Sequence, residues 1–306
     1  MLSRWAPLIR GGRFTRGGHR GVFREATSTS RGNGRTIALA GLAGLMLGGL
    51  LDHQYVYYPG RWQPGDWAGR AKLPLRDVWV TTSDGMKIHG WLVEADGSPG
   101  VLLWSHGNAG TIIDRLPVVQ ALHARGLSVL LFDYRGYGQS QGRPSEPGLY
   151  RDAEAMYEEL TVRRAVAPER VVLFGSSLGA AVATETATRH PAAGLILETP
   201  FPSIPAVVQS LYGSLPLHLL LAARYDVVSR LPNVRMPILV IHGDQDRIIP
   251  LALGRRVYDV APQPKSFYVV PGADHNDIPW VAGPQYVQRL REFVEQVTAG
   301  RPKRED

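Results

Sequence analysis

The chain of 306 residues carries 34 lysines and arginines, 27 aspartates and glutamates, and no cysteine. The absence of cysteine excludes disulfides, thiol nucleophiles and thiolate metal sites. The charge excess lies at one end, because residues 1–35 hold eight arginines and one acid, which leaves 26 basic and 26 acidic side chains for residues 36–306. We therefore expect no nucleic-acid-binding role.

Residues 1–35 are predicted to form a basic, disordered arm, and an apolar segment follows it. The sixteen residues at 36–51 are uncharged. A helix of that length covers about 24 Å, somewhat less than the roughly 30 Å hydrocarbon core of a bilayer. Tyrosines between positions 55 and 58 could extend it as an interfacial belt. We therefore assign residues 36–58 to an apolar membrane segment and its juxtamembrane continuation.

The arginines that precede the apolar segment predict the orientation of a single-pass membrane protein. They favour a cytoplasmic amino terminus and place the rest of the chain on the opposite side of the membrane. Two alternatives stay open. A cleaved signal peptide would leave a secreted or periplasmic protein, and an arginine-rich, acid-poor arm also fits a mitochondrial transit peptide.

Residues 59–298 have the pattern of one α/β domain, followed by a polar tail at 299–306. Helical stretches mostly separate the apolar runs from the third run onward. Near-continuous apolar strands that alternate with helices are typical of a mostly parallel sheet covered by helices on both faces. We expect eight strands, at 78–81, 88–93, 101–104, 129–132, 171–174, 195–197, 238–241 and 267–270.

A serine stands where the fifth of these strands must turn into a helix. Gly175-Ser176-Ser177-Leu178-Gly179 directly follows the apolar run at 171–174. Such a sharp turn crowds the positions two before and two after the serine, where glycine leaves room. Ser177 is therefore the candidate nucleophile, and the backbone N–H of Leu178, at the start of a helix, is a candidate donor to an oxyanion.

An apolar, proline-punctuated insertion occupies about residues 200–235, after the sixth strand. A loop of this length without structure is uncommon in a compact domain, so we expect short helices that form a cap over the serine. An apolar cap favours a substrate with an acyl chain or another apolar group. Alternatively, the leucines of the insertion pack against the sheet.

Candidate partners of the serine follow later in the chain. The turn after the strand at 238–241 contains Asp244 and Asp246, and His275 is the histidine that lies beyond this loop. The order serine, acid, histidine occurs in one known arrangement of the catalytic triad. His275 is therefore the candidate general base. Glu198, at the end of the strand at 195–197, is an alternative acid to the two aspartates.

Several motifs together resemble those of a known group. The combination is similar to the membrane-anchored α/β-hydrolase-domain serine hydrolases, which include protein depalmitoylases and lysophospholipases. The resemblance implies the α/β-hydrolase fold, and it favours Asp246 over Asp244 as the acid. The motifs are Ser-His-Gly-Asn-Ala-Gly at 105–110, Asp-Tyr-Arg-Gly-Tyr-Gly at 133–138, Gly-Leu-Tyr-Arg-Asp-Ala at 148–153, His-Gly-x-x-Asp-x-x-x-Pro at 242–250 and Gly-Ala-Asp-His-Asn-Asp at 272–277.

These assignments predict acyl transfer by a Ser177–Asp246–His275 triad, with the backbone N–H groups of Leu178 and Asn108 as the oxyanion hole. The expected substrate is a carboxylic ester or thioester with an acyl group that derives from a lipid, and no cofactor is implied. A peptidase or amidase with the same triad is an alternative, as is a catalytically idle, membrane-tethered binding protein. The sequence leaves the oligomeric state open.

Overall fold

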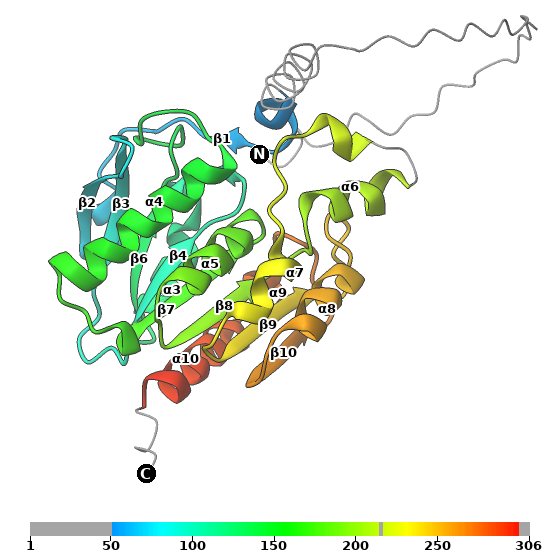
Figure 1. Cartoon of the computed structure of the whole chain (residues 1–306). Helices are drawn as coiled ribbons and strands as arrows, with labels where there is room; N and C mark the ends of the chain where they lie inside the picture. The colour runs from blue at the N-terminus through cyan, green and yellow to red at the C-terminus, as the bar shows by residue number, and fades with distance from the viewer. Residues whose placement is uncertain (1–50, 214–216, 300–306) are drawn as a thin grey trace, which may run out of the picture. The chain divides into compact units, whose positions relative to one another are not determined.

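The computed structural model describes residues 51–213 and 217–299, and its centre is one eight-stranded sheet (Figure 1). Its strands follow the order β10-β9-β8-β7-β4-β6-β3-β2. Strand β3 runs antiparallel to both β2 and β6, whereas the other neighbouring strands pair in parallel. The prediction of an eight-stranded, mostly parallel sheet is confirmed. The bounds are β2 Leu75–Thr81, β3 Lys87–Val93, β4 Val101–Ser105, β6 Ser128–Phe132, β7 Val171–Ser176, β8 Gly194–Glu198, β9 Ile238–Gly243 and β10 Lys265–Val270.

Helices cover both faces of this sheet. Helices α4, α5 and α8 lie on one face, and α3 and α10 lie on the other. The shorter elements stand in the connections between strands and helices. The bounds are α2 Trp67–Ala71, η1 Ile112–Arg115, α3 Leu116–His123, α4 Glu146–Glu158, η2 Glu159–Arg163, η3 Pro168–Arg170, α5 Leu178–Arg189, α6 Ile204–Tyr212, η4 Leu217–Leu220, α7 Val227–Arg230, η5 Leu231–Asn233, α8 Leu251–Val260, α9 Ile278–Ala282 and α10 Pro284–Thr298.

Alternate residues of the central strands build two separate hydrophobic layers. Leu103 and Leu173 pack with the α4 and α5 side of the sheet, whereas their neighbours Leu102 and Val172 pack with the α3 and α10 side. Successive side chains of a strand point to opposite faces, so a strand that is apolar throughout buries both faces at once. The near-continuous apolar runs of the sequence therefore become the middle layer of an α/β/α sandwich.

The insertion at about 200–235 folds as the short helical elements α6, η4, α7 and η5. Its later part joins the core, since Tyr225, Val227 and Leu231 are buried there. Its earlier part is different: within α6, all of which the structure describes, no side chain is fully buried. Both parts of the insertion thus pack on the domain, but α6 and η4 also keep apolar side chains such as Leu211 and Leu219 at the surface.

A short segment at the start of the described residues pairs with the loop that follows β4. Strand β1 (Tyr58–Pro59) lies parallel to β5 (Ala109–Gly110) in a separate two-stranded sheet. Asp52 is held at the insertion, because its carboxylate accepts hydrogen bonds from the backbone N–H groups of Ala222 and Ala223, at 3.0 and 2.8 Å. This segment therefore connects the insertion with the β4 loop.

Within residues 51–213 and 217–299, no helix is both long enough and apolar enough to cross a membrane. The basic arm predicted at 1–35 lies outside the described residues. So do the apolar segment predicted at 36–51, apart from Leu51, and the polar tail beyond Ala299.

Candidate active site

Ser177 lies at a strained turn between β7 and α5. Its backbone angles are φ 54° and ψ −116°, a conformation that side-chain-bearing residues rarely adopt and that costs of the order of 1–3 kcal/mol. The flanking glycines make the turn possible, because a Cβ at Gly175 would overlap the Gly179 carbonyl oxygen, and one at Gly179 would overlap that of Ser105. The strain and the close contacts hold Ser177 at the carboxyl edge of the sheet.

The structure brings Ser177, His275 and Asp246 together. The Nε2 atom of His275 lies 3.0 Å from Ser177 Oγ, and its Nδ1 atom lies 2.7 Å from Asp246 Oδ2. Asp244, the other aspartate of the loop, instead accepts a hydrogen bond from the backbone N–H of Gly272 at 2.7 Å. The three side chains therefore have the connectivity that nucleophile activation requires, from hydroxyl to imidazole to carboxylate.

Asp246 is held as a carboxylate by the donors around it. Burial acts to raise its pKa, but hydrogen bonds from His242 and His275 outweigh burial, so the pKa of Asp246 lies well below its usual value. The backbone N–H groups of Ile248 and Ile249 donate to its Oδ1 atom at 2.9 and 2.7 Å. The ionised carboxylate can thus accept a hydrogen bond from the Nδ1–H of His275 and leave Nε2 free to accept a proton from serine.

His242 is a further contact of the acid, beyond the candidate residues named from the sequence. Its side chain is fully buried, and Nε2 donates to the Ile249 carbonyl oxygen at 2.8 Å while lying 3.2 Å from Asp246 Oδ2. A Cβ at Gly254 would overlap the imidazole ring, so α8 packs directly against it. A histidine four residues before the acid, at the end of a buried strand, is the signal that could have indicated this contact.

The two candidate oxyanion donors belong to segments that adjoin Ser177. Leu178 is the first residue of α5, and N–H groups in a first helical turn have no intrahelical acceptor. The β4 loop approaches from the other side, since a Cβ at Gly107 would lie 3.6 Å from Ser177 Cβ. Asn108 is fixed there, because Nδ2 donates to the Val56 carbonyl at 3.0 Å and its carbonyl accepts from Tyr58 N at 2.9 Å.

Glu198, the alternative acid, belongs to a different set of hydrogen bonds. It is buried and accepts a hydrogen bond from Tyr286 Oη at 2.6 Å, and it also bonds with the Ser176 hydroxyl. Burial raises its pKa. Trp104 Nε1 donates to Ser176 Oγ at 3.1 Å, so the serine beside Ser177 is held by residues other than His275. Among the described residues, Asp246 and not Glu198 bonds with the imidazole.

A second buried pair lies behind the β4 loop. Asp133 Oδ1 accepts a hydrogen bond from Ile112 N at 2.9 Å and lies 3.6 Å from His106 Nε2, and both side chains are fully enclosed. Burial raises the pKa of Asp133 to about 7 and lowers that of His106 to about 3. Because His106 directly precedes Gly107, this pair supports the loop that meets the serine.

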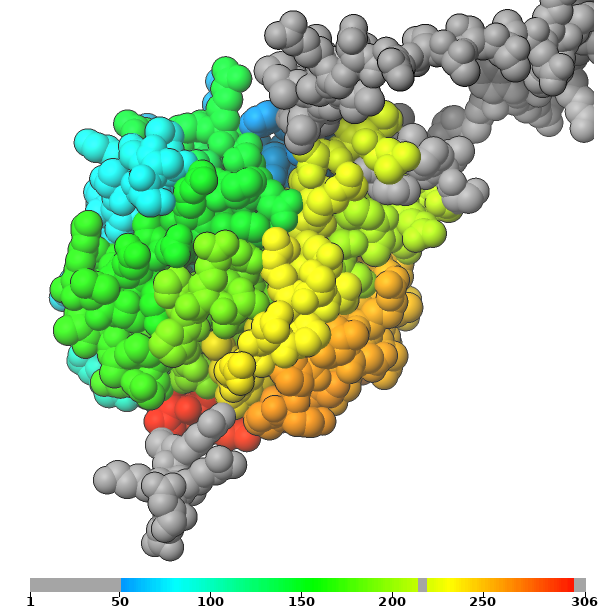
Figure 2. Space-filling view, viewed as in Figure 1, coloured from blue at the N-terminus to red at the C-terminus, as the bar shows by residue number. Residues whose placement is uncertain are grey.

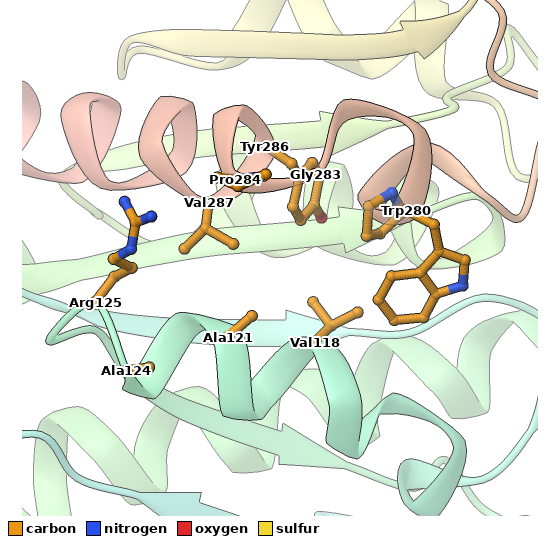
Figure 3. Close-up of a pocket in the computed structure, with 10 residues that line it drawn as sticks. Val118, Ala121, Ala124, Arg125, Trp280, Gly283, Pro284, Tyr286 and Val287 are labelled. Atoms are coloured by element: carbon orange, nitrogen blue, oxygen red, sulfur yellow. The ribbon is translucent and has the colours of Figure 1, made fainter.

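Two surface hollows in the described part of the chain lie away from Ser177. One, of about 270 Å³, is a shallow groove between α3 and the α9–α10 corner (Figure 3), with Val118 and Ala121 facing Trp280 and Val287. The other, of about 670 Å³, includes residues of the α5 carboxyl end and the β9 amino end. Neither hollow includes a residue of the triad. Within residues 51–213 and 217–299, no cluster of side chains is suited to hold a metal ion.

Comparisons with known proteins agree with this fold. A family model described as serine aminopeptidase, S33, matches residues 97–224. An uncharacterised protein of Mycobacterium tuberculosis is 39% identical over 270 residues, which cover 86% of this chain and 96% of that protein. The α/β-hydrolase domain-containing protein 17C of Mus musculus is 34% identical over 203 residues, covering 65% of this chain and 61% of that protein.

Solved structures have the same architecture. An esterase of Pyrococcus furiosus superposes with a TM-score of 0.65 at 21% identity, over 79% of this chain and all of the esterase chain. At that identity the likeness shows the fold, and the closer relatives show the family. Together the comparisons support a hydrolase activity of the serine type, and the chain belongs to the α/β-hydrolase superfamily.

Proposed function

We propose that this protein is a serine hydrolase that cleaves a carboxylic ester or thioester through an acyl-enzyme on Ser177. One observation carries the proposal: the hydrogen bonds from Ser177 Oγ to His275 and from His275 to Asp246, at 3.0 and 2.7 Å, on a strained strand-to-helix turn. A serine held in this way differs from an ordinary surface serine, because a base is already in place to take its proton.

Acylation is the first half of the proposed reaction. Ser177 Oγ attacks the carbonyl carbon, and its proton passes to His275 Nε2. Asp246 keeps the imidazole in the tautomer that can accept this proton and stabilises the imidazolium. The oxyanion of the tetrahedral intermediate accepts hydrogen bonds from the backbone N–H groups of Leu178 and Asn108. Collapse of the intermediate expels the alcohol or thiol, which receives the proton from His275.

Hydrolysis of the acyl-enzyme completes the cycle. A water molecule takes the place of the leaving group, and His275 removes one of its protons as the oxygen attacks the acyl carbon. The second tetrahedral intermediate uses the same two N–H donors. When it collapses, the serine oxygen leaves and regains its proton from His275, and the carboxylic acid is released. Ser177 is then free for another turnover.

The acyl part of the substrate is proposed to be lipid-derived. The chain resembles hydrolases that act on lipid-derived acyl groups, and the insertion that follows β8 carries Leu211, Leu219 and Leu220 at its surface. An exposed apolar surface of this kind is suited to contact with lipid, which would supply such an acyl group. The exposed fractions of these leucines are 48%, 67% and 54%.

A second candidate function is peptide or amide hydrolysis. The family model that matches residues 97–224 carries a serine aminopeptidase description, and the same triad can attack an amide. The two reactions differ in the leaving group, because an amine must be protonated before it departs, whereas a thiolate or an activated alcohol leaves readily. The comparison of leaving groups is therefore the informative experiment.

The test uses one acyl group, octanoyl, presented as an ester, a thioester and an arylamide to the full-length protein. We expect turnover of the ester and the thioester, and far slower turnover of the amide. Ser177→Ala should abolish the activity, whereas the matched control Ser176→Ala should keep most of it. Faster cleavage of amino-terminal peptide bonds than of either octanoyl ester would favour the peptidase, and activity that survives Ser177→Ala would refute the mechanism.

A further inference from the structure

Exposed apolar side chains gather where the insertion meets the first described residues. Twelve large hydrophobic side chains are exposed in the described part of the chain, and six of them lie in these two segments. We call these six residues the cap patch. They are Tyr55 (57% exposed), Tyr58 (37%), Leu211 (48%), Tyr212 (57%), Leu219 (67%) and Leu220 (54%).

The cap patch forms one surface. Helix α6 contacts η4, and Asp52 ties the first described residues to Ala222 and Ala223, immediately after η4. Tyr58 Oη donates to the Tyr55 carbonyl oxygen at 3.2 Å. Figure 1 shows the segment that starts at residue 51 beside η4 and α6, and Figure 2 shows atoms of the two segments together at one edge of the domain. Such a contiguous apolar surface marks an interaction site.

The chain outside the described residues indicates what covers this surface. The run of sixteen uncharged residues at 36–51 ends next to the cap patch. The residue that follows it, Asp52, accepts hydrogen bonds from the backbone of residues 222 and 223, shortly after Leu219 and Leu220 in the chain. A helix of sixteen residues would fall about 6 Å short of a bilayer core. An apolar surface directly after that segment would fill the difference, and tyrosines are favoured at the level of the lipid headgroups.

The cap patch is also bonded to the candidate oxyanion loop. Between Tyr55 and Tyr58, the Val56 carbonyl accepts a hydrogen bond from Asn108 Nδ2, and Tyr58 N donates to the Asn108 carbonyl oxygen at 2.9 Å. The Tyr57 and Tyr225 hydroxyls lie 2.9 Å apart, which joins the same segment to the insertion. A surface that contacts lipid would therefore be bonded directly to Asn108, the residue that follows Gly107 in the loop beside Ser177.

We propose that the cap patch is a docking surface for a lipid bilayer, and that acyl substrates reach Ser177 from that bilayer. Entry of the substrate from the bilayer rests on the proposed function, whereas docking of the cap patch does not depend on it. In this arrangement Leu219, Leu220 and Tyr212 enter the apolar edge of the membrane and Tyr55 and Tyr58 lie among the headgroups. The enzyme then acts on substrates that stay partly in the membrane.

The absence of cysteine makes a direct test possible, because one introduced cysteine takes a label uniquely. The full-length variant Leu219→Cys is labelled with an environment-sensitive fluorophore and reconstituted into vesicles of phosphatidylcholine and phosphatidylglycerol, with or without spin-labelled lipid. Val162→Cys is the matched control, because Val162 is 74% exposed and lies in η2, away from the insertion. We expect blue-shifted emission and quenching by spin-labelled lipid at position 219 and neither at position 162.

Two results would overturn the proposal. Water-like emission at position 219 would show that lipid does not cover the patch. A blue shift that spin-labelled lipid fails to quench would show that another part of the chain, or a second copy, covers it. Hydrolysis separates this proposal from the proposed function: Leu219→Ser with Leu220→Ser should slow cleavage of a vesicle-embedded ester at least about tenfold and leave a soluble short ester unaffected. If the wild type cleaves neither the vesicle-embedded ester nor the soluble ester, the proposed hydrolase function is refuted. The fluorescence result for membrane docking would remain valid.

Discussion

Replacement of Asp246 by asparagine tests the geometry of the candidate triad with very little change in size. In the wild type, Asp246 Oδ2 accepts a hydrogen bond from the Nδ1–H of His275 at 2.7 Å. An amide nitrogen in that place would present a hydrogen to Nδ1, so the imidazole would move its own proton to Nε2. Nε2 would then donate to Ser177 Oγ and could no longer accept the serine proton.

The expected loss follows from this change of tautomer. An acid-to-amide change at the corresponding position of a serine hydrolase triad lowers kcat about 10⁴-fold, which corresponds to about 5.5 kcal/mol of activation free energy. The oxyanion hole should remain intact, because the donors Leu178 and Asn108 lie on other elements, so a residual rate above that of water should persist. The assay is steady-state hydrolysis of a soluble ester, with Tm recorded to show that the variant is folded.

Asp244→Asn is the matched control for this experiment. Asp244 belongs to the same loop, and it accepts a hydrogen bond from Gly272 N at 2.7 Å. We expect its kcat to stay within a few-fold of the wild-type value. Equal losses in the two variants would show that the loop, and not the acid–histidine contact, sets the rate. Undiminished activity of a folded Asp246→Asn variant would refute the assignment.

Three further predictions concern the surroundings of the site. Burial raises the pKa of Asp133 to about 7, so the folded protein retains a proton that the unfolded chain loses near pH 4, and the wild type loses about 1.4 kcal/mol per pH unit between these values. Asp133→Asn should therefore gain stability relative to the wild type as the pH rises from 4 to 7, and urea unfolding that shows no such trend would contradict this. Asn108→Ala removes the hydrogen bond to Val56 but keeps the backbone N–H, so kcat should fall only a few-fold, whereas a loss of about 10²-fold or more would show that the side chain itself acts in catalysis. Gly179→Ala places a methyl group on the Ser105 carbonyl, so we expect at least about 1–3 kcal/mol of destabilisation in urea unfolding together with loss of esterase activity, and wild-type values for both would refute the close approach seen there.

The sheet was predictable because its strands carry their own signal. Each predicted run, such as 171–174 or 238–241, lies inside an observed strand. The central strands are apolar throughout because they are buried on both faces. Ser177 and His275 could also be named, because the strained turn requires glycines at fixed positions and the order of serine, acid and histidine restricts the choice, whereas the preference for Asp246 over Asp244 came from the family resemblance. These features are local or depend only on order along the chain.

Other features depend on contacts that no local pattern encodes. The bonds from Asn108 to Val56 and Tyr58 span about fifty residues, and the bond from Tyr286 to Glu198 spans 88. The position of His242 in the sequence is a local signal, but its contacts form only because Ile249 and Asp246 fold back beside it. The insertion was predicted as short helices, but which of its side chains are buried, such as Tyr225, and which are exposed, such as Leu219, depends on the domain surface beneath it.

The proposed hydrolysis requires Ser177 to be an activated nucleophile. Its most direct test is the intact mass of the full-length protein after reaction with a fluorophosphonate, followed by mapping of the modified peptide. We predict one adduct per chain, located on Ser177, absent in Ser177→Ala, strongly reduced in His275→Ala and retained in Ser176→Ala. Absence of an adduct from the folded wild-type protein, or an adduct that persists in Ser177→Ala, would show that Ser177 is not the nucleophile.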